Sequence, residues 1–98
     1  MTRHFPATVR RLLDVGCGEG WASGALRRSH PALSVTGIEI DAAAAADARS
    51  RLDRVLEGDV MAVLRALSNA GERFDAFLFA DALEHFEDPI AALSIARV

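Results

Sequence analysis

The segment Leu12–Gly20, which reads LLDVGCGEG, most constrains what this chain can fold into. Its first half is a short apolar run broken only by Asp14, as in a buried strand. Its second half holds three alternate glycines, Gly16, Gly18 and Gly20. Glycine adopts positive φ at little cost and lets another molecule approach the backbone closely. Because residues 21–29 have helical character, the glycines lie at a strand-to-helix turn, where free N–H groups and the helix dipole favour an anion. The sequence predicts a ligand-binding loop here.

The composition limits the kinds of protein that this chain can be. With 98 residues, the chain has room for a single domain, residues 1–98, and its 51% hydrophobic and 26% charged residues are typical of a globular protein. A net charge of −3 gives no broad attraction to nucleic acid or to an anionic membrane. The single cysteine, Cys17, excludes an internal disulfide and a multi-cysteine zinc cluster. No signal peptide and no membrane-length apolar run are visible. We therefore expect a cytoplasmic protein that binds neither nucleic acid nor membranes.

Strand and helix patterns alternate along the whole chain. Apolar and β-branched runs predict strands over about residues 11–15, 33–40, 54–58 and 74–81. Helical patterns cover about residues 21–28, 42–52, 61–69 and 89–98, the last one beginning at Pro89 after a capping Asp88 and continuing to Val98. This alternation predicts an α/β fold, a Rossmann-like parallel sheet with helices on both faces.

The fourth predicted strand is the most apolar segment and would lie at the edge of a four-stranded sheet. An uncovered apolar edge is unusual. We therefore expect the domain to be incomplete at its C-terminus after the fourth strand and its helix. A missing C-terminal segment, or the partner in a homodimer, would then cover the fourth strand.

The glycine loop departs from the dinucleotide fingerprint G-x-G-x-x-G. The third glycine comes one position early, and Trp21 stands where the fingerprint needs it. We expect the indole to crowd the helix against the sheet or against a pyrophosphate, and Glu19 to repel a pyrophosphate. A nucleoside without phosphates suits such a loop better, which disfavours a fragment of an NAD-dependent oxidoreductase.

Four segments, in order and at domain-like spacing, resemble the class I S-adenosylmethionine-dependent methyltransferases. LLDVGCGEG resembles the family's glycine-rich first motif, and VTGIEID, residues 35–41, resembles its second-strand motif with an acid at the strand end. GDV, residues 58–60, resembles the adenine-contacting turn, and residues 74–89 resemble the fourth-strand motif. The resemblance implies S-adenosyl-L-methionine as cofactor and methyl transfer to a small-molecule acceptor by direct displacement.

The resemblance also implies roles for residues of the first two motifs. Gly16 and Gly18 would bring the backbone to the methionyl part of the cofactor, with Cys17 between them as a small space-filling residue of the loop. Asp14 would hold the methionyl amino group through water, or would instead satisfy N–H groups of the loop. Glu39 would accept hydrogen bonds from both ribose hydroxyls.

The remaining implied contacts concern the adenine ring and the amino group. Ile40 would lie against the adenine face, although an ordinary core position is the alternative. Asp59 would accept from the adenine amino group while the backbone of Val60 reads the ring edge, or Asp59 would cap the helix that follows. Ala80 would offer its carbonyl to the cofactor's amino group.

The sequence says less about the residues that would act on the methyl acceptor. His85, beside Glu84, could act as a general base, although both residues could equally order the loop that holds them. No histidine has partners at metal-ligand spacing, so we expect no metal. The competing function from another class is a non-catalytic module that binds the cofactor or docks to a larger assembly.

Overall fold

The structure, a computed structural model, describes residues 9–80 and 93–97. Along the chain the elements are β1 (Arg11–Val15), α1 (Trp21–Ser29), β2 (Ser34–Glu39), α2 (Ala42–Ala48), β3 (Arg54–Glu57), α3 (Val60–Asn69), β4 (Ala76–Ala80) and β5 (Leu93–Arg97). The alternation of strand and helix predicted from the sequence is confirmed as far as β4, with most boundaries within a few residues.

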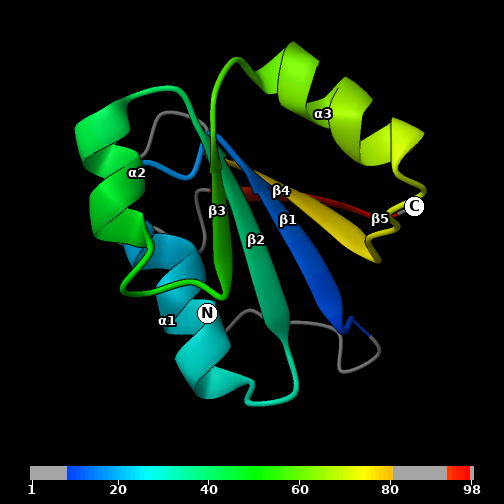
Figure 1. Ribbon diagram of the computed structural model, residues 1–98. Helices are drawn as coiled ribbons and strands as arrows, with labels where there is room; N and C mark the ends of the chain where they lie inside the picture. Colours follow the sequence, from blue (N-terminus) through cyan, green and yellow to red (C-terminus); the bar gives the residue numbers. More distant parts are fainter. Residues whose placement is uncertain (1–8, 81–92, 98) are drawn as a thin grey trace.

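The sheet has the order β3-β2-β1-β4-β5, and its first four strands are parallel (Figure 1). Strand β1 lies in the middle, with Val15 opposite Ile38 of β2 and Phe79 of β4. The chain leaves β1 to one side through β2 and β3 and returns to its other side at β4. The strand order therefore reverses beside β1, and ligands of open α/β sheets bind at the carboxyl ends of the strands beside such a point.

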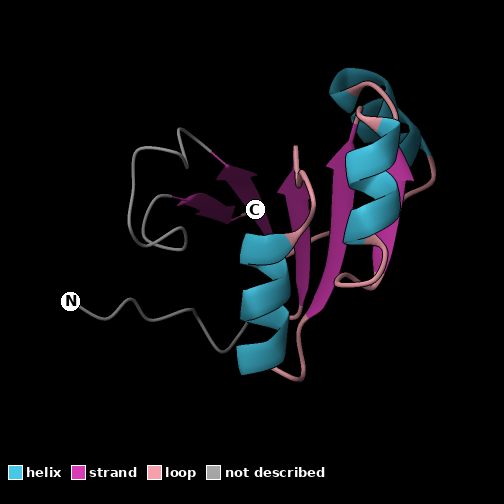
Figure 2. Ribbon diagram, turned by 90° about the vertical axis from the view of Figure 1, so that its left-hand side faces the viewer, coloured by secondary structure: helices cyan, strands magenta, loops and turns pink. Residues whose placement is uncertain are grey.

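Helices cover both faces of the sheet, as predicted. On one face α1 and α2 pack over a core that includes Leu12, Val35 and Leu78, and Figure 2 shows both helices in front of the strands. On the other face α3 packs over Leu13 and Ile38. Because side chains alternate along a strand, neighbouring residues of β1 enter different cores.

The start of α1 lies close to the end of α2 and to the turn that follows it. A Cβ at Gly20 would lie 3.3 Å from both Ala48 Cβ and Leu52 Cγ, and one at Gly24 would lie 3.2 Å from Arg51 Cβ. Ala48 is fully buried. The third glycine of the loop therefore serves packing against α2, which corresponds to the helix predicted over about residues 42–52.

The prediction of a helix over residues 89–98 is wrong at residues 93–97, and residues 89–92 and 98 lie outside the described part of the chain. Residues Leu93–Arg97 form β5, which pairs antiparallel with β4 so that Ala80 lies opposite Leu93. An edge strand has unpaired N–H and C=O groups, and pairing along a whole strand satisfies them, which outweighs a local helix preference. The expectation that β4 needs a partner or a missing segment at its edge is corrected too, because the chain's own β5 covers it.

Candidate functional site

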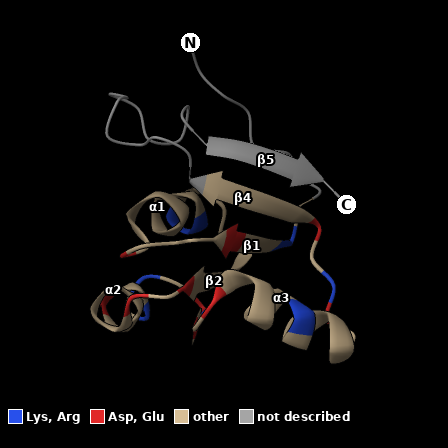
Figure 3. Cartoon of the chain, turned by 90° about the horizontal axis from the view of Figure 1, so that it is seen from above, with Lys and Arg blue, Asp and Glu red and all other residues tan. Residues whose placement is uncertain are grey.

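Backbone hydrogen bonds tie together the loops that follow β1, β2 and β3. The N–H groups of Gly16 and Cys17 both donate to the carbonyl of Ile38, each at 2.9 Å, and Gly58 N donates to Glu39 O at 2.9 Å. Figure 3 views the molecule from above and shows α1 and α2 on one side of this edge and α3 on the other. The three predicted ligand-contacting segments therefore lie together.

Glu39 connects the glycine loop to the end of β2. Its Oε1 accepts a hydrogen bond from Gly18 N at 2.8 Å, and its Oε2 accepts one from Asp41 N at 3.0 Å. A carboxylate offers about four acceptor positions. Both oxygens are therefore fixed in place and each still has room for one more donor.

The prediction of a cluster of free N–H groups in the loop is wrong for four of its amides. Gly16 and Cys17 donate to β2, Gly18 donates to Glu39, and Gly20 N donates to Cys17 O at 3.0 Å. A pyrophosphate on a glycine loop depends on such amides. With these donors used and acidic side chains beside them, the loop favours a ligand that brings donors or positive charge.

The backbone at the first two glycines is open. Gly16 and Gly18 have φ of 75° and 58°, values that favour glycine, and a Cβ at either would meet no described atom within 4 Å. This bare stretch of main chain leaves space where the sequence predicts the close approach of a ligand.

Below the loop lies a buried pair of polar side chains. Asp14 is 2% exposed and Ser23 is fully buried, and neither Asp14 Oδ1 nor Ser23 Oγ has a hydrogen-bond partner in the described structure. Burial raises the pKa of Asp14 from 3.8 to about 6, and the negative charge of Glu39 adds to that, while the nearby Ser23 hydroxyl opposes it. The reading in which Asp14 satisfies loop N–H groups finds no support, because those of Gly16, Cys17 and Gly18 are donated elsewhere.

Cys17 packs across the sheet against β2. A Cβ at Gly37 would lie 2.6 Å from Cys17 Sγ, so only glycine leaves room for the thiol. Burial, with the charges of Asp14 and Glu39, raises the pKa of Cys17 to about 12. The thiol fills space, as predicted. Sequence reasoning missed Gly37, although an isolated glycine within a strand signals close approach.

The prediction that Trp21 crowds the helix against the sheet is wrong. The indole is 60% exposed, its Nε1 donates to Glu19 Oε1 at 3.0 Å, and the Arg51 guanidinium lies 3.4 Å from the ring centroid. Arg51 also donates to Glu19 O at 3.0 Å. These contacts hold the glycine loop against the turn that follows α2 and draw the Glu19 side chain toward the indole.

Residues predicted to surround the adenine lie at the same edge. Ile40 is 68% exposed, so the alternative of an ordinary core position is wrong. Asp59 caps α3 by accepting from Ala62 N at 3.0 Å through Oδ2, which leaves its other oxygen for a ligand. Val60 is the first residue of α3, and a helix leaves its first N–H groups without an internal partner. Ala80 ends β4. Their contacts with a ligand remain predictions.

His85 and Glu84 lie outside the described residues. Across residues 9–80 and 93–97, no group of three His, Cys, Asp or Glu side chains could hold a metal, and no helix is long and apolar enough to cross a membrane.

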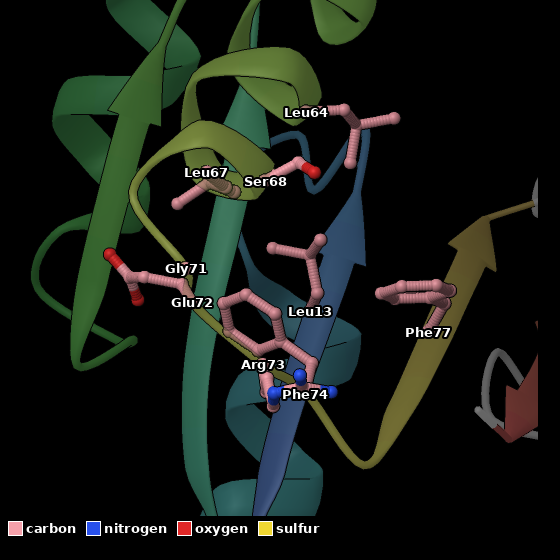
Figure 4. Close-up of a pocket in the computed structure, with 9 residues that line it drawn as sticks. All are labelled: Leu13, Leu64, Leu67, Ser68, Gly71, Glu72, Arg73, Phe74 and Phe77. Carbon is pink, nitrogen blue, oxygen red and sulfur yellow. The ribbon is translucent and has the colours of Figure 1, made fainter.

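Two hollows of the described structure lie beside α3, away from the glycine loop. One, of about 320 Å³, lies beside α3 and is lined partly by Leu13, Phe74 and Phe77 (Figure 4). The other, of about 660 Å³, runs between β3 and α3 and reaches Asp59 at one end. Neither is lined by Asp14 or Glu39, so both lie apart from the proposed ligand site.

Residues 13–98 match the profile of the family described as "Methyltransferase domain". This chain belongs to that family. The match includes every predicted site residue and the segment that holds His85.

An uncharacterized methyltransferase of Mycobacterium tuberculosis is 40% identical to the methyltransferase domain over 93 residues, which cover 91% of this chain and 44% of that protein. A ubiquinone biosynthesis O-methyltransferase of Cereibacter sphaeroides is 36% identical over 97 residues, which cover 95% of this chain and 38% of that protein. The chain thus spans less than half the length of these relatives.

Among solved structures, the plantazolicin methyltransferase BpumL in complex with SAH aligns with a TM-score of 0.62 at 24% identity, covering 87% of this chain and 32% of that one. This likeness confirms the Rossmann-like fold predicted from the sequence.

Proposed function

We propose that this methyltransferase domain binds S-adenosylmethionine and forms the cofactor-binding part of an enzyme that methylates a small-molecule acceptor. The Glu39 carboxylate carries the proposal, because Gly18 N and Asp41 N fix its two oxygens beside the open backbone of the glycine loop. The free acceptor positions of these oxygens suit the two hydroxyls of a ribose.

The buried acid beneath the loop fits the amino-acid part of the same ligand. Asp14 Oδ1 has no donor in the described structure, and a buried acceptor without a donor costs free energy until one arrives. An ammonium group supplies both a donor and a compensating charge. Gly16 and Gly18 leave space for the methionyl chain to pass above Asp14.

When bound, S-adenosylmethionine supplies a methyl group on a sulfonium, which a nucleophile can take by direct displacement. The domain's own residues contribute orientation: Glu39 holds the ribose, the exposed Ile40 lies against the adenine, and Asp14 anchors the amino group. Orientation alone can provide much of the acceleration of such a reaction. The name O-methyltransferase of several relatives supports an oxygen nucleophile. Because an oxygen acceptor must lose a proton, we keep His85 as the proposed base.

The test of this proposal is a ligand titration that follows the emission of Trp21, the single tryptophan of the chain, which adjoins the loop. We expect saturable change with S-adenosylmethionine and none with NAD. Glu39→Ala should weaken binding by about 1–3 kcal/mol, the range for lost hydrogen bonds to a charged acceptor. Folding should change little, since both backbone amides can bind water instead.

Glu57→Ala is the matched control, because Glu57 is an exposed acid that lies opposite Glu39 in the register of β2 and β3. Its affinity should equal that of the wild type. Unchanged affinity in Glu39→Ala removes that residue from the site, and saturation by NAD instead refutes the proposed cofactor. Release of S-adenosylhomocysteine in the presence of candidate acceptors then separates an enzyme from a binding module.

A further inference from the structure

The side chain of Arg51 reaches the glycine loop from the turn that follows α2, outside the four segments that resemble the methyltransferase family. Its Nη1 donates to the carbonyl of Glu19 at 3.0 Å, and its guanidinium carbon lies 3.4 Å from the centroid of the Trp21 ring. The same nitrogen lies 3.1 Å from both Oδ2 and the carbonyl oxygen of Asp47 on α2. The side chain is 16% exposed. The guanidinium is therefore fixed between α2 and the first residue of α1.

The carbonyl that Arg51 binds belongs to a tight turn at the crest of the glycine loop. A backbone hydrogen bond across residues 17–20 closes this turn, and Gly18 and Glu19 are its two central residues. Gly18 N donates to Glu39 Oε1 at 2.8 Å. One central residue of the turn is therefore held by Glu39, which precedes α2, and the other by Arg51, which follows α2.

We propose that Arg51 is a positioning residue for cofactor binding, which keeps this turn in the conformation that joins Gly18 to Glu39. The inference rests on the proposed function, in which the fixed carboxylate of Glu39 receives the ribose hydroxyls. Glu39 contacts the ligand, whereas Arg51 acts through the turn.

An arginine suits this role because a guanidinium is planar. Its face stacks on an aromatic ring while its edge donates hydrogen bonds, whereas a lysine ammonium is a compact point charge. Trp21 is 60% exposed, so burial does not fix its ring, and the stacked cation and the hydrogen bond from Nε1 to Glu19 hold it instead. Loss of the Arg51 side chain removes the cation from the ring and the donor from the turn at the same time.

Isothermal titration calorimetry with S-adenosylhomocysteine tests the proposal on the wild type, Arg51→Ala and a matched control, Arg49→Ala. Arg49 caps the C-terminus of α2, but its Nη2 donates at 3.3 Å to the carbonyl of Val55 on β3. We expect Arg51→Ala to weaken binding by about three- to tenfold, because water replaces only part of a lost charge-assisted hydrogen bond. Arg49→Ala should bind like the wild type.

A double-mutant cycle with Glu39→Ala shows whether Arg51 acts through the turn. Without the carboxylate, the position of Gly18 N no longer orients a ligand contact. Arg51→Ala should then weaken binding by less than about twofold, since residues that act through one contact are not additive. A general loss of structure would give the same loss in both backgrounds.

Quenching of Trp21 emission by acrylamide gives a readout that needs no ligand. The guanidinium covers one face of the indole, so the quenching constant should be higher in Arg51→Ala than in the wild type and in Arg49→Ala. Arg51→Lys keeps the charge but cannot stack and donate together, so its affinity should lie between those of the wild type and Arg51→Ala. If urea unfolding shows that Arg51→Ala does not fold, Arg51→Lys takes its place throughout.

An affinity equal to that of the wild type in the Arg51 variant overturns the proposal. So does an equal loss with and without Glu39, or an equal loss in Arg49→Ala. An unchanged quenching constant also overturns it, because the guanidinium then does not cover the indole. If S-adenosylhomocysteine does not bind to the wild type, the proposed function fails and the inference fails with it.

Discussion

Replacing Gly37 by alanine tests whether the glycine loop is held in position by packing across the sheet. The new Cβ would lie 2.6 Å from Cys17 Sγ, 2.8 Å from Leu52 Cδ1 and 3.0 Å from Cys17 Cβ. Such atoms pack best at roughly 3.5–4.0 Å, so the thiol must move by about 1 Å. Overpacking of this kind costs roughly 1–3 kcal/mol. For a domain of this size, each kcal/mol lowers the Tm by about 4–8 °C.

A double-mutant cycle isolates the contact. Unfolding by urea is measured for the wild type, Gly37→Ala, Cys17→Ala and the double variant. Cys17→Ala removes the sulfur, the nearest of the three atoms, and leaves the β-carbon of residue 17 at 3.0 Å and the Leu52 methyl, which can rotate away. We therefore expect the cost of Gly37→Ala to fall by about 0.5–2 kcal/mol in that background, within the usual range for residues in contact. Cys17→Ala alone is the control for the loss of the thiol.

The same variants should affect ligand binding, because Cys17 N donates to Ile38 O and a displaced Cys17 shifts the loop. We expect Gly37→Ala to weaken binding of S-adenosylhomocysteine and the double variant to recover part of it. If Gly37→Ala costs nothing, or costs the same in both backgrounds, the thiol does not pack on β2 and this reasoning fails.

Two further predictions follow from the pKa values of the site. Because the pKa of Asp14 rises from 3.8 to about 6 on folding, its ionisation opposes folding above about pH 6 and has no effect below about pH 4. Asp14→Asn should therefore be more stable than the wild type at pH 7.5, by about 1–3 kcal/mol. Urea unfolding at pH 7.5 and 4.5 checks this, and an equal difference at both pH values contradicts it. Cys17, with a pKa raised to about 12, should react with iodoacetamide at pH 8 far more slowly than an unfolded cysteine. Addition of denaturant should restore the rate, and fast alkylation of the folded protein would show an exposed thiolate.

The sequence was sufficient for the parallel part of the fold because that part follows local rules. Short apolar runs alternate with amphipathic helices, and Asp59 caps α3, which is one of the two roles expected for it. The carboxyl ends of parallel strands meet at one edge, so the glycine loop, Glu39 and Asp59 had to lie near one another. The prediction of a helix over residues 89–98 was wrong at residues 93–97 because the structure there does not follow local rules. Residues 93–97 pair with the unpaired backbone groups at the edge of β4, which lies earlier in the chain. The helical preference of a short segment does not take such a distant partner into account.

Which hydrogen bonds each polar atom of the site makes depended on the tertiary structure. The sequence predicted that Glu39 stands at the strand end, but only the folded chain showed both of its oxygens fixed by Gly18 and Asp41. It predicted free N–H groups in the loop, and the carbonyl of Ile38 from a neighbouring strand accepts two of them.

By itself, then, the sequence determined the order of the elements, the place of the glycine loop and the acid at the end of β2. These follow from periodicity and from where glycine and carboxylates stand in the chain. The tertiary structure alone decided that Asp14 Oδ1 and Ser23 Oγ are buried without hydrogen-bond partners among the described residues and that Cys17 requires Gly37. Burial and close contact depend on residues that are far apart in the chain. The pKa of a buried carboxyl therefore depends on neighbours that come from other segments of the chain.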